Sequence, residues 1–117
     1  MEHLKRRQDF VAAARAPSQA MPGMVVQARN RQDSAAPRVG FTCSKKIGNA
    51  VIRNRSKRRM REAARVVLGE RAQSGFDYVL IGRLATATRS FADLQNDLMS
   101  ALKRLHATPH EVADKGK

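Results

Sequence analysis

The run KKIGNAVIRNRSKRRMREAAR, residues 45–65, contains most of the side chains in this sequence that could do chemistry. Close to half of them are Lys or Arg, and the only acid is Glu62. Cations at this density bind phosphate groups, and Arg adds a planar fork that can donate two parallel hydrogen bonds to one phosphate. The chemistry that this run predicts is therefore binding of a polyanion.

Helical periodicity divides this run into two faces. With about 100° between successive residues, one side of the helix is apolar and should pack on a sheet; it consists of Ile52, Ser56, Met60, Ala63 and Val67. The opposite side consists of Asn54, Lys57, Arg58, Arg61 and Arg65. Arg53 and Arg55 project to the flanks. Arg59 lies near the apolar side, so we expect its stem along the core edge and its head in water.

A solvated outer face is the ordinary alternative for a charged helix. Such a face mixes Glu with Lys at a spacing of four, whereas Arg53, Lys57, Arg61 and Arg65 form a ladder of like charges. Each adjacent pair costs a few tenths of a kcal/mol in the free protein. An anionic partner would relieve this repulsion. Lys45, Lys46 and Asn49 add donors just before the helix start, where the helix dipole also favours an anion.

The composition supports a polyanion partner. The 117 residues carry a formal net charge of +13, well above what solubility requires of a small domain. Nucleic acid and an anionic membrane surface are the two candidates. No apolar run approaches the roughly 20 residues of a spanning helix, and MEHLKRRQDF lacks the apolar core of a signal peptide. We therefore expect a cytoplasmic protein that binds nucleic acid and no membrane.

Residues for intrinsic catalysis are not grouped in the sequence. Cys43 is the single cysteine and lies in an apolar, strand-like stretch, where a structural role is expected. His3, His106 and His110 lie in terminal segments and form no triad or zinc site with it. No acidic cluster could hold the metal ions of a nuclease site. We expect no catalytic residue and no metal site in this chain.

Residues 4–44 predict a helix followed by two strands. The helix covers residues 4–14, and the Pro- and Gly-containing segment 15–23 predicts a turn or an extended connector. Residues 24–29 and 38–44 predict strands that pair antiparallel across a polar loop. Phe10 is the only aromatic residue near the first basic cluster, and it could either anchor the first helix in the core or stack on a single-stranded base.

The second half predicts helix, strand, helix. Gly48 can adopt a positive φ and Asn49 can cap a helix that runs from residue 50 to 68, with Gly69 as its stop. The apolar run 76–81 predicts a central buried strand. Ser90 with Asp93 predicts the start of a last helix, whose buried stripe consists of Phe91, Leu94, Leu98, Leu102 and Leu105. Residues 1–106 are expected to form a single RNA-binding domain and residues 107–117 a flexible tail.

The stretch RVGFTCSKKIGNAVIRNRSKRRMREAAR, residues 38–65, resembles the signature of the bacterial ribonuclease P protein family. The family's Arg-Asn-Arg triplet corresponds to Arg53, Asn54 and Arg55. The resemblance implies an α/β fold, an α+β sandwich in the order α-β-β-α-β-α, similar to the second domain of a small-subunit ribosomal protein. It also implies a left-handed βαβ crossover, although about 98% of such connections are right-handed.

The resemblance further implies a function. The chain would be the protein subunit of ribonuclease P, in which a catalytic RNA with bound Mg²⁺ hydrolyses the phosphodiester that joins the 5′ leader to precursor tRNA. Its partners would be this RNA and precursor tRNA, with no DNA. The RNA-binding residues implied are Lys45, Lys46, Asn49, Arg53, Asn54, Arg55, Lys57, Arg58, Arg61 and Arg65, and Phe10 would bind the leader.

Three positions depart from the family pattern. Ala14 and Gln27 stand where family members often have aromatic residues, so leader stacking should be weaker here. Arg59 replaces a common apolar residue. Two other functions remain as alternatives: a ribosomal or RNA-chaperone protein without processing activity, and, much less favoured, a protein-only nuclease.

Overall fold

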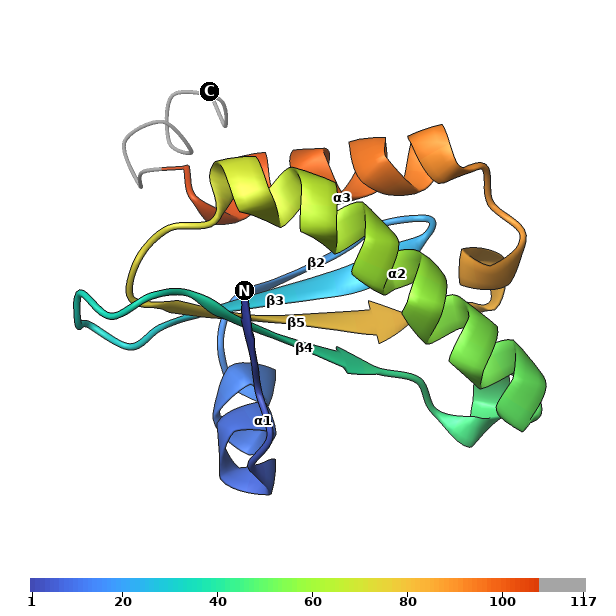
Figure 1. Cartoon of the computed structure of the whole chain (residues 1–117), viewed down its shortest axis with the longest axis horizontal. Coiled ribbons are helices and arrows are strands. Elements are labelled where there is room, and N and C mark those ends of the chain that lie inside the picture. Colours follow the sequence, from blue (N-terminus) through green and yellow to red (C-terminus); the bar gives the residue numbers. More distant parts are fainter. Residues whose placement is uncertain (108–117) are drawn as a thin grey trace, which may run out of the picture.

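A five-stranded sheet with helices on both faces forms the protein (Figure 1). The computed structural model describes residues 1–107. Its strands, in the sheet order β1-β4-β5-β3-β2, are β1 (Glu2–His3), β2 (Ser18–Ala20), β3 (Met24–Asn30), β4 (Arg38–Thr42) and β5 (Phe76–Gly82). Its helices are α1 (Arg7–Ala14), α2 (Ala50–Arg71) and α3 (Phe91–Leu105), with short 3₁₀ turns η1 (Lys45–Ile47) and η2 (Leu84–Ala87). The mixed α and β fold is the one expected.

Strand β5 is the centre of the sheet. It pairs antiparallel with β3 and parallel with β4, so the prediction that β3 and β4 pair with each other is wrong. The loop between them passes the start of β5, where the Arg31 amide donates to the Gly75 carbonyl and the Gly75 amide donates to the Ala35 carbonyl. The most apolar strand takes the position that is buried on both faces, as predicted.

Helix α2 joins the parallel neighbours β4 and β5, which makes the βαβ crossover. The hand of this crossover stays a prediction.

The two faces of the sheet carry different layers (Figure 1). Helices α2 and α3 cover one face, and the main core lies beneath them, with Met60, Tyr78, Leu80 and Leu98 among its most buried side chains. Helix α1 covers the other face. There a smaller cluster is built from Leu4, Ala13 and Val79, with Phe10 and Ile81 packed against it. Successive side chains of β5 point to opposite faces of the sheet. Tyr78 and Leu80 therefore belong to the main core, while Val79 and Ile81 belong to the layer under α1.

Helix boundaries differ from the prediction at two places. Helix α2 continues through Gly69 to Arg71, because Gly69 faces open space and nothing at that point requires a positive φ. The left-handed turn comes instead at Gly75, with φ of 81°. Helix α1 begins at Arg7 and not at Leu4, because the Leu4 amide donates to the Val39 carbonyl and extends the pairing of β1 with β4.

Two short edge strands, β1 and β2, were not predicted, and β2 lies within the expected connector 15–23. The predicted helix start at Ser90 is confirmed, since its side chain accepts a hydrogen bond from the Asp93 amide at 3.1 Å. The expected tail, apart from residue 107, and His110 lie outside the described residues. Within residues 1–107, no helix is long and apolar enough to cross a membrane.

Candidate RNA interface

The start of α2 is fixed by a glycine and a cap, as predicted. Gly48 has φ of 145°, and a Cβ there would lie 2.9 Å from the Ile52 side chain, so only glycine fits without strain. Asn49 then accepts a hydrogen bond from the Ile52 amide at 3.0 Å. The preceding turn η1 carries Lys45 and Lys46, both exposed. The turn thus presents two ammonium groups beside the N-terminus of the helix.

Helix α2 has the two faces that its periodicity predicts. Ser56, Met60, Ala63 and Val67 are buried against the sheet and α3, and Ile52 is half-buried. The outward surface consists of Asn54, Arg55, Arg58, Arg61 and Arg65, all exposed, flanked by the half-buried Arg53 and Lys57. Arg55, predicted on a flank, is thus exposed, and Lys57, predicted on the outward side, is half-buried. We call these seven residues, together with Lys45, Lys46 and Asn49, the basic face. All ten predicted RNA-binding residues thus lie on η1, on the N-cap of α2 or on α2 itself.

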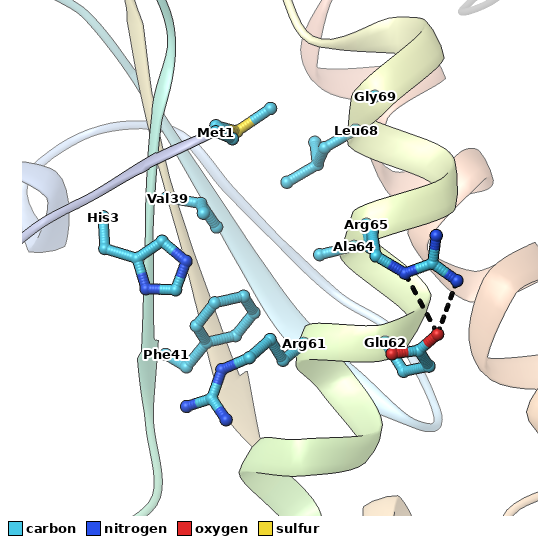
Figure 2. Close-up of a pocket in the computed structure, with 10 residues that line it drawn as sticks. All are labelled: Met1, His3, Val39, Phe41, Arg61, Glu62, Ala64, Arg65, Leu68 and Gly69. Carbon is cyan, nitrogen blue, oxygen red and sulfur yellow. Dashed lines mark hydrogen bonds and ion pairs between the residues drawn. The ribbon is translucent and has the colours of Figure 1, made fainter.

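The cations of the basic face are nearly free of acidic partners. Among the cations of this face, only Arg65 forms a salt bridge within residues 1–107, with Glu62 at 2.6 Å (Figure 2). That hydrogen bond lowers the pKa of the Glu62 carboxyl. Arg61 lies over the Phe41 ring, with its guanidinium carbon 5.6 Å from the ring centroid. The Nε atom of Arg53 is buried and has no hydrogen-bond partner among the described residues. This surface is therefore positively charged and largely unpaired.

Arg59 does not keep its head in water as predicted. Its Nε donates to the Thr86 carbonyl at 3.0 Å, and its second guanidinium nitrogen donates to the Arg89 carbonyl. The side chain therefore ties α2 to the segment that leads into α3. The sequence alone shows only that Arg59 lies near the apolar side of the helix. Its two hydrogen bonds could not be predicted, because the carbonyls belong to residues 27 and 30 positions further along the chain.

Phe10 lies on the other side of the sheet from the basic face. Its ring is half-buried between α1 and the sheet, directly over Gly40, where a Cβ would approach it to 2.5 Å. The ring thus packs against the smaller core cluster. The structure does not bring Phe10 together with the ten residues of the basic face.

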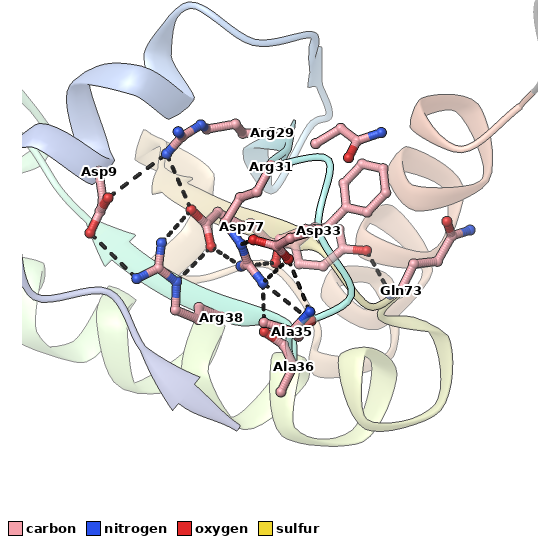
Figure 3. Close-up of polar contacts among 12 residues, drawn as sticks. Asp9, Arg29, Arg31, Asp33, Ala35, Ala36, Arg38, Gln73 and Asp77 are labelled. Carbon is pink, nitrogen blue, oxygen red and sulfur yellow. Dashed lines mark hydrogen bonds and ion pairs between the residues drawn. The ribbon is translucent and has the colours of Figure 1, made fainter.

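A buried carboxylate that the sequence analysis missed joins several segments (Figure 3). Asp77 on β5 is fully buried and accepts hydrogen bonds from Arg31 at 2.5 Å and from Arg38 at 2.8 Å. Arg29 lies 3.5 Å from the same carboxylate, and Asp9 of α1 pairs with Arg29 and Arg38. We call the cluster of Asp77, Asp9, Arg29, Arg31 and Arg38 the Asp77 hub. The sequence held one signal for this cluster, namely an acidic residue inside an otherwise apolar strand.

Cys43 is half-buried against the main core. Burial raises the pKa of its thiol, so the thiol stays protonated at neutral pH. No group of three or more His, Cys, Asp or Glu side chains within residues 1–107 could hold a metal ion. Neither observation supplies a nucleophile or a metal centre.

The fold and the basic face define a small α+β RNA-binding protein in which one helix presents cations away from the core. The ribonuclease P family model matches residues 1–106. The chain is 58% identical to the ribonuclease P protein component of Ruegeria pomeroyi, over 89% of this chain and 86% of that protein. It is 50% identical to the ribonuclease P protein component of Caulobacter vibrioides, over 91% of this chain and 72% of that protein.

Solved structures agree with these sequence matches. The ribonuclease P protein of Staphylococcus aureus superposes with a TM-score of 0.75 at 30% identity, covering 91% of this chain and 96% of that one. The protein from Thermotoga maritima gives 0.73 at 28% identity, covering 92% and 100%. The chain belongs to the bacterial ribonuclease P protein family, as its Arg-Asn-Arg region suggested.

Proposed function

We propose that this chain, as the protein subunit of ribonuclease P, seats the catalytic RNA of that ribonucleoprotein on its basic face. The observation that carries the proposal is the absence of acidic partners for every cation of that face except Arg65, within residues 1–107. Like charges at adjacent turns of α2 repel one another in the free protein, and RNA phosphates would relieve that repulsion. The apolar side of α2 is already packed, so RNA can bind without disturbing the core.

Hydrolysis is assigned to the RNA and its bound Mg²⁺ ions. Asp9, Asp33, Glu62, Asp77 and Asp97 are all engaged in ion pairs with arginines. These pairs leave those carboxylates poorly placed to ligate a metal or to act as a base, which supports a binding role for the protein. The protein would assist by neutralising phosphates where the RNA and its substrate meet.

The α1 side of the sheet is proposed to receive the 5′ leader of precursor tRNA. Phe10 is half-buried, which leaves room for a second role as a stacking surface beside its packing on the sheet. Lys5, Arg6 and Arg7 lie beside it in the sequence and are exposed. An aromatic ring among cations suits single-stranded RNA.

A binding measurement tests the basic face. In Arg53→Gln with Arg55→Gln, two charges are lost while the aliphatic stems remain, so we expect weaker binding to the cognate ribonuclease P RNA. The slope of log affinity against log salt should fall by about one for each lost phosphate contact. The control is Lys103→Gln with Arg104→Gln, which removes two exposed charges from α3. Equal affinity of wild type and the α2 variant at about 150 mM salt would refute the assignment.

A reconstitution separates the proposal from the ribosomal or RNA-chaperone alternative. The protein, the cognate RNA and precursor tRNA are mixed at low Mg²⁺, and release of the leader is followed. Stimulation that requires the protein supports the ribonuclease P role. Binding of the RNA without any stimulation would favour the chaperone alternative, and cleavage by the protein alone would favour a protein-only nuclease.

A further inference from the structure

A groove runs between the C-terminal half of α2 and the sheet edge formed by β1 and β4 (Figure 2). Its volume is about 350 Å³, within the range of roughly 300–1,000 Å³ typical of small-molecule sites. Val39, Ala64 and Leu68, all buried, form its apolar floor. It lies on the α2 side of the sheet, separate from the α1 side proposed for the leader.

Flat groups line the strand side of this groove. The His3 and Phe41 rings meet edge to face with centroids 5.8 Å apart, and the Arg61 guanidinium covers Phe41. On the helix side, Arg65 and Glu62 pair at the rim and are both exposed. The groove thus combines aromatic and guanidinium planes, an apolar floor and two cations against one acid.

A nucleotide matches this combination of groups. The base of a nucleotide has two flat faces that stack on aromatic rings and on guanidinium planes. The phosphate of the nucleotide can replace Glu62 as the partner that accepts charge-assisted hydrogen bonds from Arg65. The freed Glu62 carboxylate can then accept a hydrogen bond from an exocyclic amino group. An apolar peptide would instead desolvate Arg61 and Arg65 without compensation.

The groove is continuous with the basic face, because Arg61 and Arg65 belong to both. We propose that this groove binds one unpaired nucleobase of the same RNA that the basic face seats, with the ring against Phe41 and Arg61 and its phosphate on Arg65. This inference rests on the proposed function, and it adds a pocket that recognises an extruded base to a surface that otherwise contacts phosphates.

Two variants test the pocket in the full-length protein. Phe41→Leu removes the ring and keeps an apolar side chain. Ala64→Phe fills the groove from the helix side. Each should weaken binding to the cognate ribonuclease P RNA about tenfold. The salt slope should fall by no more than about one, because the phosphate on Arg65 is the single phosphate contact that depends on the bound base. Phe91→Leu on α3 is the matched control and should bind like wild type. Phe91 was predicted to belong to the buried stripe of this helix, but it is exposed.

Chemical footprinting identifies the base. The RNA is probed with dimethyl sulfate, kethoxal and a carbodiimide, which together report on all four bases. We expect an unpaired base that wild type protects to become reactive again with Phe41→Leu and with Ala64→Phe, but not with Phe91→Leu. Urea unfolding of each variant shows that it is folded, and if one is not, the other still decides the outcome.

The failures of the two proposals can be told apart. If wild type does not bind the RNA, the proposed function itself fails. If wild type binds tightly while both groove variants bind equally well with unchanged footprints, only the base pocket is overturned. Concentration-dependent self-association of wild type that Ala64→Phe abolishes would also overturn it, because the occupant would then be a second copy of the chain.

Discussion

At Asp77 one carboxylate faces the guanidinium groups of Arg29, Arg31 and Arg38, and none of its surface reaches solvent. A buried charge is tolerated only when partners satisfy it. Burial alone would raise the pKa of the Asp77 carboxyl, but hydrogen bonds from Arg38 and Arg31 outweigh burial and hold this pKa below its ordinary value. The hub therefore depends on an ionised Asp77.

Asp77→Asn should lower the free energy of unfolding by about 3 kcal/mol, because it leaves two hydrogen-bonded arginines without their anion. Urea denaturation at neutral pH measures the loss. Glu62→Gln is the control, since it breaks the exposed pair with Arg65 and should cost less than about 1 kcal/mol. Similar small losses in both variants would mean that the hub does not stabilise the fold.

The hub also predicts a pH dependence. A carboxyl whose pKa is lower in the folded than in the unfolded state stabilises the fold above its unfolded pKa of about 3.9. That contribution is lost as pH falls through the folded pKa. The free energy of unfolding of wild type should therefore decline below about pH 4, and Asp77→Asn should show a shallower decline. Parallel curves would contradict the assignment.

Phe10 supports a prediction about the substrate. Phe10→Leu keeps an apolar side chain over Gly40 but removes the proposed stacking surface, so binding of precursor tRNA should weaken about tenfold, while binding of mature tRNA stays unchanged. Binding of both RNAs to the reconstituted holoenzyme is the measurement. Equal losses for the two, together with a lower free energy of unfolding, would make Phe10 a core residue only.

At the scale of elements, local patterns predicted most of what the structure contains. The periodicity of α2 and α3 and the apolar run of β5 depend on neighbouring residues, and so do the caps at Asn49 and Ser90. The pairing of β3 and β4 with β5 could not be predicted, because strand partners depend on contacts between distant segments. The end of α2 was placed too early because a glycine need not stop a helix whose surroundings favour its continuation.

Substitution by alanine should have opposite effects on stability at Gly48, which precedes the N-cap of α2, and at Gly69, inside α2. Gly48→Ala should lower the free energy of unfolding by about 1–2 kcal/mol, since alanine at φ of 145° is strained and its Cβ meets Ile52. Gly69→Ala should raise it by about 0.5–1 kcal/mol, because alanine is the better helix former and nothing lies within 4 Å. Urea denaturation of both variants checks the pair, and a stabilising Gly48→Ala would show that the turn before α2 is not constrained.

For the molecule as a whole, the basic face was predictable from sequence because all its residues lie on one helix and its approach. The groove and the hub were not, because each is assembled from segments far apart in the chain. His3 and Phe41 meet Arg61 only after β1 and β4 have paired beside α2. The sequence places the charge, and tertiary packing decides which cations are free and which are paired.

The net charge of +13 predicts opposite effects of salt on folding and on binding. Raising salt from about 20 to about 200 mM should raise the melting temperature of the free protein, because screening weakens self-repulsion. The same change should weaken RNA binding steeply. The α2 double variant, Arg53→Gln with Arg55→Gln, should show a smaller rise in melting temperature. A melting temperature that falls with salt would show that stabilising ion pairs outweigh the repulsion.

The central place of β5 has a consequence for how the protein is made. During translation β3 and β4 are synthesised before β5. They do not pair with each other, and each of them pairs with β5, residues 76–82. Until the ribosome has synthesised that strand, only the separate pairs β1–β4 and β2–β3 can form, and two-stranded pairs are marginally stable on their own. The cationic segment therefore lacks a complete sheet on which to pack. Assembly of the domain is therefore a late event that follows synthesis of most of the chain.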